Sequence, residues 1–99
     1  MSRYRTRTGV VLTSICGESV LIAAKAIRDQ VKSFAQLNES SAFLWRLFEP
    51  GASTEDAEKA LMEEYEIEDP AMAGAAVKAF VQQMTENGFL LKEGDNNEE

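Results

Sequence analysis

The sequence has no histidine and a single cysteine, Cys16, among its 99 residues. A disulfide within the chain is therefore impossible, and a zinc site built from cysteine and histidine ligands is excluded as well. Cys16 has no histidine to activate it, and it stands beside Gly17 in a predicted hairpin turn. We therefore expect no catalytic thiol.

Long apolar runs are also missing. No stretch approaches the roughly 20 apolar residues that a membrane-spanning helix needs, and the start of the chain has no apolar signal core. The sequence thus predicts a soluble, cytoplasmic protein without a membrane partner.

Positive charge is scarce. The chain carries 10 lysine and arginine residues against 17 acidic ones, a formal net charge of −7. This balance disfavours a nucleic-acid partner. The charges are unevenly spread: residues 1–8 form a basic arm, residues 92–99 an acidic tail predicted to be disordered, and residues 9–91 a single domain. The arm can bind an anionic partner, but we expect a solvated segment that pairs loosely with the tail.

Three strands are predicted in the first part of the domain. Val10–Ile15 is apolar and β-branched, and it returns through a turn at residues 16–18 into a second strand at residues 19–23. A charged connector covers residues 24–30. Residues 31–37 then alternate apolar and polar side chains, as in a half-buried strand, but the alternation slips at Phe34–Ala35, so that Phe34 and Ala35 compete for the inner face.

The junction between this third strand and the following helix is the most informative stretch. Asn38 is a favourable N-cap, because its side chain can accept a hydrogen bond from a backbone N–H one turn later. The helix that follows, from about Glu39 to Phe48, is too apolar for a surface helix, with Leu44, Trp45 and Leu47 inside it. We interpret it as the central core helix.

Two more helices follow. Ser53 caps the second, which continues to about Tyr65, and Asp69 with Pro70 begins the third. The third helix ends at Asn87–Gly88, a left-handed C-cap pattern, and residues 89–91 are expected to pack back on the core. The predicted fold is an α+β, small winged-helix-like domain: an N-terminal three-stranded antiparallel sheet followed by three helices.

No motif for catalysis or cofactor binding is present, and we expect neither an enzyme nor a bound cofactor or metal. Eight acidic residues lie between Ser53 and Asp69, and we interpret them as a solvated helix face. A winged-helix outline suggests DNA binding. The helices from Ser53 to Asn87, however, hold only Lys59 and Lys78 against nine acidic residues, so they would repel phosphates.

The order of these features resembles the PqqD-like family (pyrroloquinoline-quinone biosynthesis protein D). The resemblance rests on Leu37–Trp45 after a β-hairpin, on the Ser53–Thr54 cap after Pro50–Gly51, and on the Asn87–Leu90 helix end. It runs from about Gly9 to Leu91. Each motif is only a cap with apolar residues, and their order and spacing make the resemblance specific.

The resemblance implies a peptide-binding accessory protein, a RiPP recognition element. Such a protein recognises the leader of a ribosomally made precursor peptide and presents it to a modifying enzyme, commonly a radical S-adenosylmethionine enzyme. The leader is expected to add a strand beside the third strand, against the third helix. The residues that we expect to bind the peptide lie on these two elements: Val31, Ser33, Phe34, Ala35, Leu37, Ala73, Ala76, Val77 and Phe80.

The same sequence features are compatible with other functions. The same fold can serve as a structural or regulatory subunit that binds a protein partner without a precursor peptide, or, less in keeping with the charges, as a transcription regulator. An exposed edge strand permits a monomer or a strand-paired dimer. If the connector at residues 24–30 folds over the third strand, the proposed edge is covered.

Overall fold

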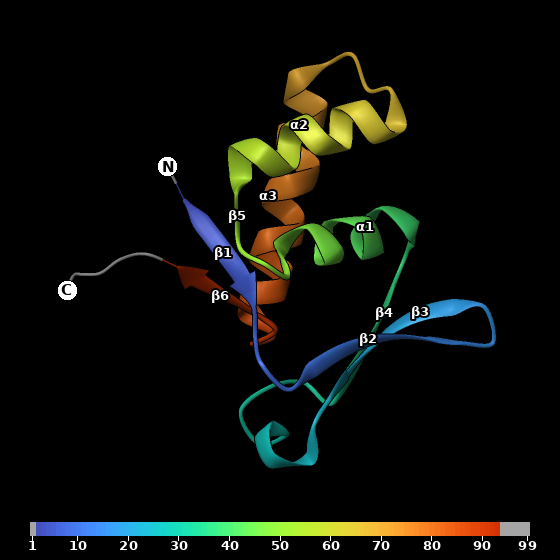
Figure 1. Cartoon of the computed structure of the whole chain (residues 1–99), viewed down its shortest axis with the longest axis vertical. Helices are drawn as coiled ribbons and strands as arrows, with labels where there is room; N and C mark the ends of the chain where they lie inside the picture. The colour runs from blue at the N-terminus through green and yellow to red at the C-terminus, as the bar shows by residue number, and fades with distance from the viewer. Residues whose placement is uncertain (1, 94–99) are drawn as a thin grey trace.

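The three predicted helices are present in the computed structural model, which describes residues 2–93. They are α1 (Glu39–Phe48), α2 (Thr54–Tyr65) and α3 (Pro70–Glu86). Each begins where the sequence places a cap: the side chains of Asn38, Ser53 and Asp69 accept hydrogen bonds from backbone N–H groups of the first turn. Local cap chemistry therefore sets the helix starts, and the α+β winged-helix-like prediction is confirmed (Figure 1).

An antiparallel three-stranded sheet precedes the helices, also as predicted. Its strands are β2 (Val10–Ile15), β3 (Glu18–Ala23) and β4 (Phe34–Leu37), in the order β2–β3–β4. Cys16 and Gly17 make the tight turn between β2 and β3, and both have positive φ angles, 53° and 80°. That geometry matches the twist of a two-residue hairpin.

The third strand is shorter than the sequence suggested. Regular pairing begins at Phe34 rather than at Val31. The connector is also more ordered than a polar linker, since Lys25–Ile27 form a 3₁₀ turn, η1. This turn is held by the hydrogen bond from the Ala24 N–H to the Gly9 carbonyl, 2.7 Å, a contact between distant residues that no local pattern reveals.

A second sheet corrects our interpretation of the two chain ends. Residues 3–6 are not a solvated arm but the strand β1 (Arg3–Thr6), the central strand between β5 (Ala52–Ser53) and β6 (Leu90–Glu93). Lys92 and Glu93, assigned to a disordered tail, belong to β6. The rest of the predicted tail, residues 94–99, lies outside the described residues.

The charge pairing expected between the two ends exists, but within this sheet. The Nε atoms of Arg3 and Arg5 lie 3.5 and 4.0 Å from carboxylate oxygens of Glu93. All three side chains are partly exposed, so the ion pairs contribute little to stability and mainly favour the register.

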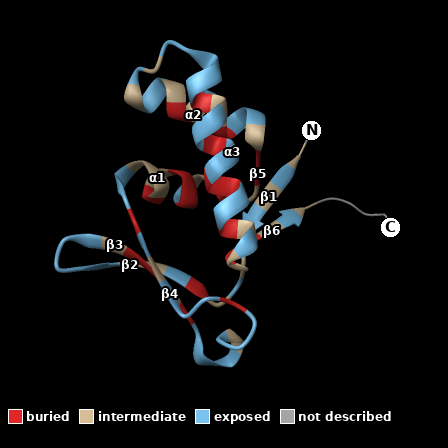
Figure 2. Cartoon of the chain, turned by 180° about the vertical axis from the view of Figure 1, so that it is seen from behind, coloured by how far each residue is buried: buried red, intermediate tan, exposed pale blue. Residues whose placement is uncertain are grey.

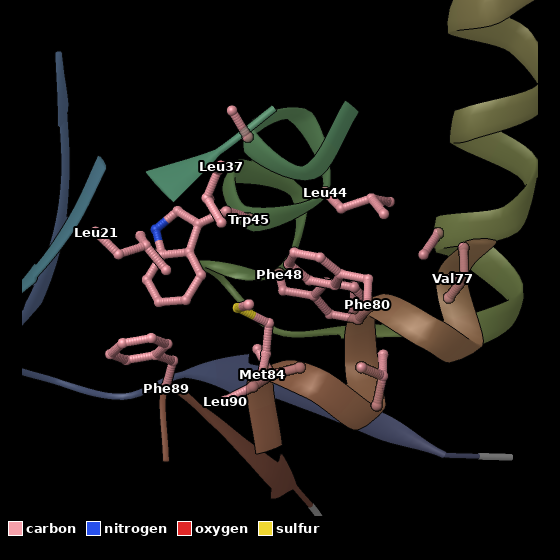
Figure 3. Close-up of a cluster of buried hydrophobic side chains, with 14 of the residues drawn as sticks. Leu21, Leu37, Leu44, Trp45, Phe48, Val77, Phe80, Met84, Phe89 and Leu90 are labelled. Carbon is pink, nitrogen blue, oxygen red and sulfur yellow. The ribbon is translucent and has the colours of Figure 1, made fainter. Parts of the chain in front are cut away.

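The core lies where both sheets and the three helices meet, as the buried residues in Figure 2 show. Trp45 of α1 is completely buried, and in Figure 3 its indole lies among Leu21, Leu37 and Phe89. Phe48, on the next turn, stacks on Phe80 of α3 with ring centroids 6.0 Å apart. The interpretation of α1 as the central core helix is confirmed. Among residues 2–93, no helix combines the length and the apolar content that crossing a membrane requires.

Candidate functional site

The outer edge of β4 is the feature of this fold best suited to bind a peptide. Among the residues that the structure describes, β4 pairs with β3 on one side and with no strand on the other. An unpaired edge offers backbone N–H and C=O groups as a template for an added strand. In Figure 1, β4 leads from the sheet into α1, away from both chain ends.

The hydrogen bonding identifies which residues of β4 face outward. The Ala23 N–H donates to the Ser33 carbonyl, 3.0 Å, in the register that pairs Ile22 with Phe34. Because hydrogen-bonded and non-hydrogen-bonded pairs alternate in an antiparallel ladder, Ser33, Ala35 and Leu37 direct their backbone groups toward β3. The outward backbone groups therefore belong to Phe34 and Gln36.

The open edge ends at Lys32. The Lys32 N–H, which has the same outward direction, donates to the Asn87 carbonyl at the end of α3, 3.2 Å away. Gly88 packs against the same segment, and a Cβ atom there would lie 2.8 Å from Cγ1 of Val31. The C-terminal end of α3 thus closes one end of the edge and leaves Phe34–Leu37 accessible.

The connector does not cover β4 with hydrogen bonds. Within the described part of the chain, its hydrogen bonds to other segments run to Gly9, to the Ala23 carbonyl and to Arg7, which donates to the Gln30 side chain over 2.7 Å. These partners lie before β2 and at the end of β3. The connector therefore packs against the end of the sheet rather than along the open edge.

The structure places the strand residues of the predicted site in three environments. Phe34 and Ser33 are exposed, Ala35 is half-buried, and Val31 and Leu37 are buried. The competition between Phe34 and Ala35 for the inner face is decided for Ala35, which packs against the core, while Phe34 is 57% exposed. Gln36 was not among the predicted residues. The break in the alternation at Phe34–Ala35 was the one sequence signal for Gln36, because it allows a register in which Phe34 and Gln36 share the outward side.

The helix residues of the predicted site are mostly internal. Ala73, Val77 and Phe80 belong to the core, with at most 5% of each residue exposed. Ala76, by contrast, is exposed on the surface of α3. The structure therefore connects α3 to β4 through the C-terminal end of the helix, at Asn87 and Gly88.

Two observations concern metal binding and ionisation among the described residues. No group of three or more acidic or cysteine side chains is arranged to hold a metal ion within residues 2–93. Burial raises the pKa of the Tyr65 phenol above its usual value, and the nearby carboxylates of Glu39 and Glu64 raise it further. The phenol therefore stays protonated near neutral pH.

A hollow of about 370 Å³ lies between the β2–β3 turn and the start of α1. Its lining is mainly polar and includes Glu18, Asn38 and Arg46. It borders Leu37, the last residue of β4, and so adjoins the open edge.

We expect no binding to duplex DNA at moderate salt. The α2–α3 region holds Lys59 and Lys78 as its only cations against nine acidic residues, so few phosphates could be neutralised. Fluorescence anisotropy of a labelled duplex, titrated at two salt concentrations, is the measurement. Micromolar binding that weakens with added salt would contradict this expectation.

Two solved structures share this fold. One, "Lasso peptide synthetase B1 complexed with the leader peptide", has a TM-score of 0.70 and 25% sequence identity, and the match covers 89% of this chain and 96% of that one. The other, "TbiB1 in Complex with the TbiA(beta) Leader Peptide", has a TM-score of 0.72 and 21% identity and covers 92% and 99%.

A family comparison agrees with the sequence resemblance. No curated protein sequence matches the chain. The family model described as "Coenzyme PQQ synthesis protein D (PqqD)", however, matches residues 18–90, which include β3, β4 and all three helices. The resemblance found from the sequence is confirmed, and the chain belongs to the PqqD family.

Proposed function

We propose that this protein binds the leader segment of a ribosomally made precursor peptide as an added strand along β4. The observation that carries the proposal is the open edge at Phe34–Leu37, where Phe34 and Gln36 direct their backbone groups outward. Two proteins of the same fold, each solved with a leader peptide, support this assignment.

The protein acts as a binding partner and not as a catalyst. Main-chain hydrogen bonds give affinity in strand addition, and neighbouring side chains give specificity. The bound leader is then presented to a separate modifying enzyme, for which we propose a radical S-adenosylmethionine enzyme, in keeping with the family. On this proposal the site is the accessible edge of β4, and the exposed Ala76 of α3 lies beside the bound peptide. The buried residues of the predicted site support this edge from the core: Val31, Leu37, Ala73, Val77 and Phe80.

Replacing Gln36 by proline tests the strand addition. Proline removes one outward N–H, and an edge strand tolerates it when that N–H faces solvent. A peptide first selected from a display library of the source genome's short reading frames serves as the probe. We expect Gln36→Pro to weaken its binding about tenfold or more, since a peptide carbonyl loses its partner. Isothermal titration calorimetry measures the change.

Gln36→Ala is the matched control. It removes the side-chain hydrogen bond to Glu18 but keeps the backbone N–H. We expect it to change the affinity by less than about threefold. A folded Gln36→Pro variant with unchanged affinity would contradict strand addition along β4.

Ala76→Trp tests the role of α3 separately. Ala76 is exposed, so the larger side chain should leave the fold intact and obstruct a peptide that lies against this helix. Amide-shift mapping by NMR with the same peptide provides a direct reading. Shifts confined to residues 53–65, with β4 and α3 unaffected, would rule out the proposed site.

A further inference from the structure

An apolar row crosses the solvent-facing side of the β2–β3–β4 sheet. Val11 pairs with Ile22, and Ile22 pairs with Phe34, so these three residues stand in line across the three strands. Directly paired residues project to the same face, here the face opposite Leu21 and Ala35, which pack on the core. We call this line the outer row.

The outer row is unusually exposed for apolar side chains. Val11 is 60% and Phe34 57% exposed, while Ile22 is half-buried between them. A hollow of about 340 Å³ opens beside the Val11 and Ile22 part of the row and is lined by these two residues, Ala24 and Arg28 among others. A continuous exposed apolar surface of this kind commonly marks an interaction site.

The outer row ends at the open edge. Phe34 is both its last member and one of the two residues whose backbone groups point outward from β4. A strand that adds to β4 forms its hydrogen-bonded pairs with Phe34 and Gln36. The side chain of the peptide residue opposite Phe34 therefore lies on the outer face, directly beside the phenyl ring.

The length of this pairing is limited. The hydrogen bond from Lys32 to the Asn87 carbonyl occupies the next outward N–H. Within the described strand, only the positions opposite Phe34 and Gln36 therefore put paired peptide side chains on the outer face. The Gln36 side chain donates a hydrogen bond to the Glu18 carboxylate, so this second position is polar.

The charge distribution also favours a peptide as occupant. Residues 9–37, which form the β2–β3–β4 sheet and its connector, hold three lysine and arginine residues and two acidic ones. Arg28 lines the hollow, and Lys32 directly precedes the open edge. The surroundings of the outer row therefore favour an acidic segment, although the chain as a whole has a net charge of −7.

We propose that Phe34 determines peptide specificity by selecting an apolar side chain on the outer face. That side chain extends the outer row as its fourth member, and the peptide residue two positions away, beside Gln36, is polar. Acidic residues flank the apolar one toward Lys32. This inference rests on the proposed function, since it requires a strand added to β4, and it names the class of peptide that the strand belongs to.

The experiment uses the full chain and the peptide selected from the display library, labelled for fluorescence anisotropy. We expect Phe34→Ser to weaken binding about tenfold, because an apolar contact on each partner becomes exposed. Replacing the apolar peptide residue by serine should give a similar loss. Combining both changes should give little further loss, since the two side chains contact each other.

Ile15→Ser is the matched control. Ile15 lies on the same face and is 49% exposed, but it sits on β2 beside the hairpin turn, opposite Glu18. We expect it to change the affinity by less than about twofold. Equal losses for Phe34→Ser and Ile15→Ser would overturn the assignment of specificity to Phe34.

The outcomes separate this inference from the proposed function. If Gln36→Pro abolishes binding while Phe34→Ser binds as the wild type, the peptide adds to β4 but the outer row does not select it. If no peptide is enriched, or if Gln36→Pro has no effect, the proposed function fails and this inference fails with it. A concentration-dependent dimer in sedimentation that Phe34→Ser abolishes and the peptide does not displace would assign the outer row to a second copy, and would overturn the inference.

Discussion

Trp45→Ala is expected to lower the free energy of unfolding by about 3–5 kcal/mol, the range for loss of a large buried aromatic side chain. Trp45 has no exposed surface and stands between the β2–β3–β4 sheet and the end of α3. Removing it leaves a cavity that Leu21 and Phe89 cannot fill without moving. Urea denaturation followed by far-UV circular dichroism measures the change, because the variant lacks the only tryptophan of the chain.

Trp45→Phe separates the contribution of volume from that of the indole N–H. The Nε1 atom is buried and has no acceptor among the described protein atoms. Phenylalanine keeps much of the apolar volume and removes this donor, so we expect a clearly smaller loss than for alanine. A loss below about 1 kcal/mol for Trp45→Ala itself would mean that this side chain is not part of the core.

Gly88→Ala is the second substitution with a large expected effect, about 2–4 kcal/mol from backbone strain and steric overlap together. Gly88 has a φ angle of +84°, and an added Cβ would lie 2.8 Å from Val31 Cγ1 and 3.1 Å from the Gln30 carbonyl oxygen. Either α3 or the segment leading into β4 must move. Thermal and urea denaturation measure the loss.

Gly17→Ala provides the control for the strain alone. Gly17 has a similar φ angle of +80°, but nothing lies within 4 Å of its added Cβ. We expect a loss of about 1–2 kcal/mol, the cost of a left-handed backbone for a residue with a side chain. Equal losses at the two positions would show that the approach of Val31 to Gly88 is not tight. Gly88→Ala should also weaken peptide binding, because a shift at Gly88 would move the adjacent Asn87, whose carbonyl accepts the hydrogen bond from Lys32 at the start of the open edge.

The helices could be predicted from the sequence because their boundaries depend on neighbouring residues. Asn38, Ser53 and Asp69 each accept a hydrogen bond from the first turn of their own helix. A cap of this kind is complete within four residues, so a local pattern is sufficient to place it.

The second sheet was missed because its pairing is non-local. Arg3 pairs with Glu93, at opposite ends of the described chain. The order Arg3, Tyr4, Arg5, Thr6 alternates exposed and half-buried residues, which is itself a strand pattern. Arg3 and Arg5 suggest a solvated charged segment, whereas Tyr4 between them packs edge-on against Phe48 and ties the strand to the core.

The candidate site was predicted only at the level of its elements. The sequence indicated an edge strand next to the third helix, but the direction of each backbone group depends on the register with β3. Because that register pairs Ile22 with Phe34, Phe34 and Gln36 offer outward groups and Ser33 does not. Similarly, Phe80 stacks on Phe48 of α1, and this contact between two helices, which the spacing along α3 alone does not reveal, keeps its ring in the core.

The pairing of β1 with β6 brings the two ends of the described chain together. Arg3 and Glu93 are direct partners, so a chain that enters at one leaves at the other, about 5 Å away. β4 lies on the other side of the molecule from both ends (Figures 1 and 2). The unit can therefore be spliced into a surface loop of a larger enzyme without stretching either junction, and its open edge would still face away from the host. A graft of this kind needs no linker design beyond two short connections.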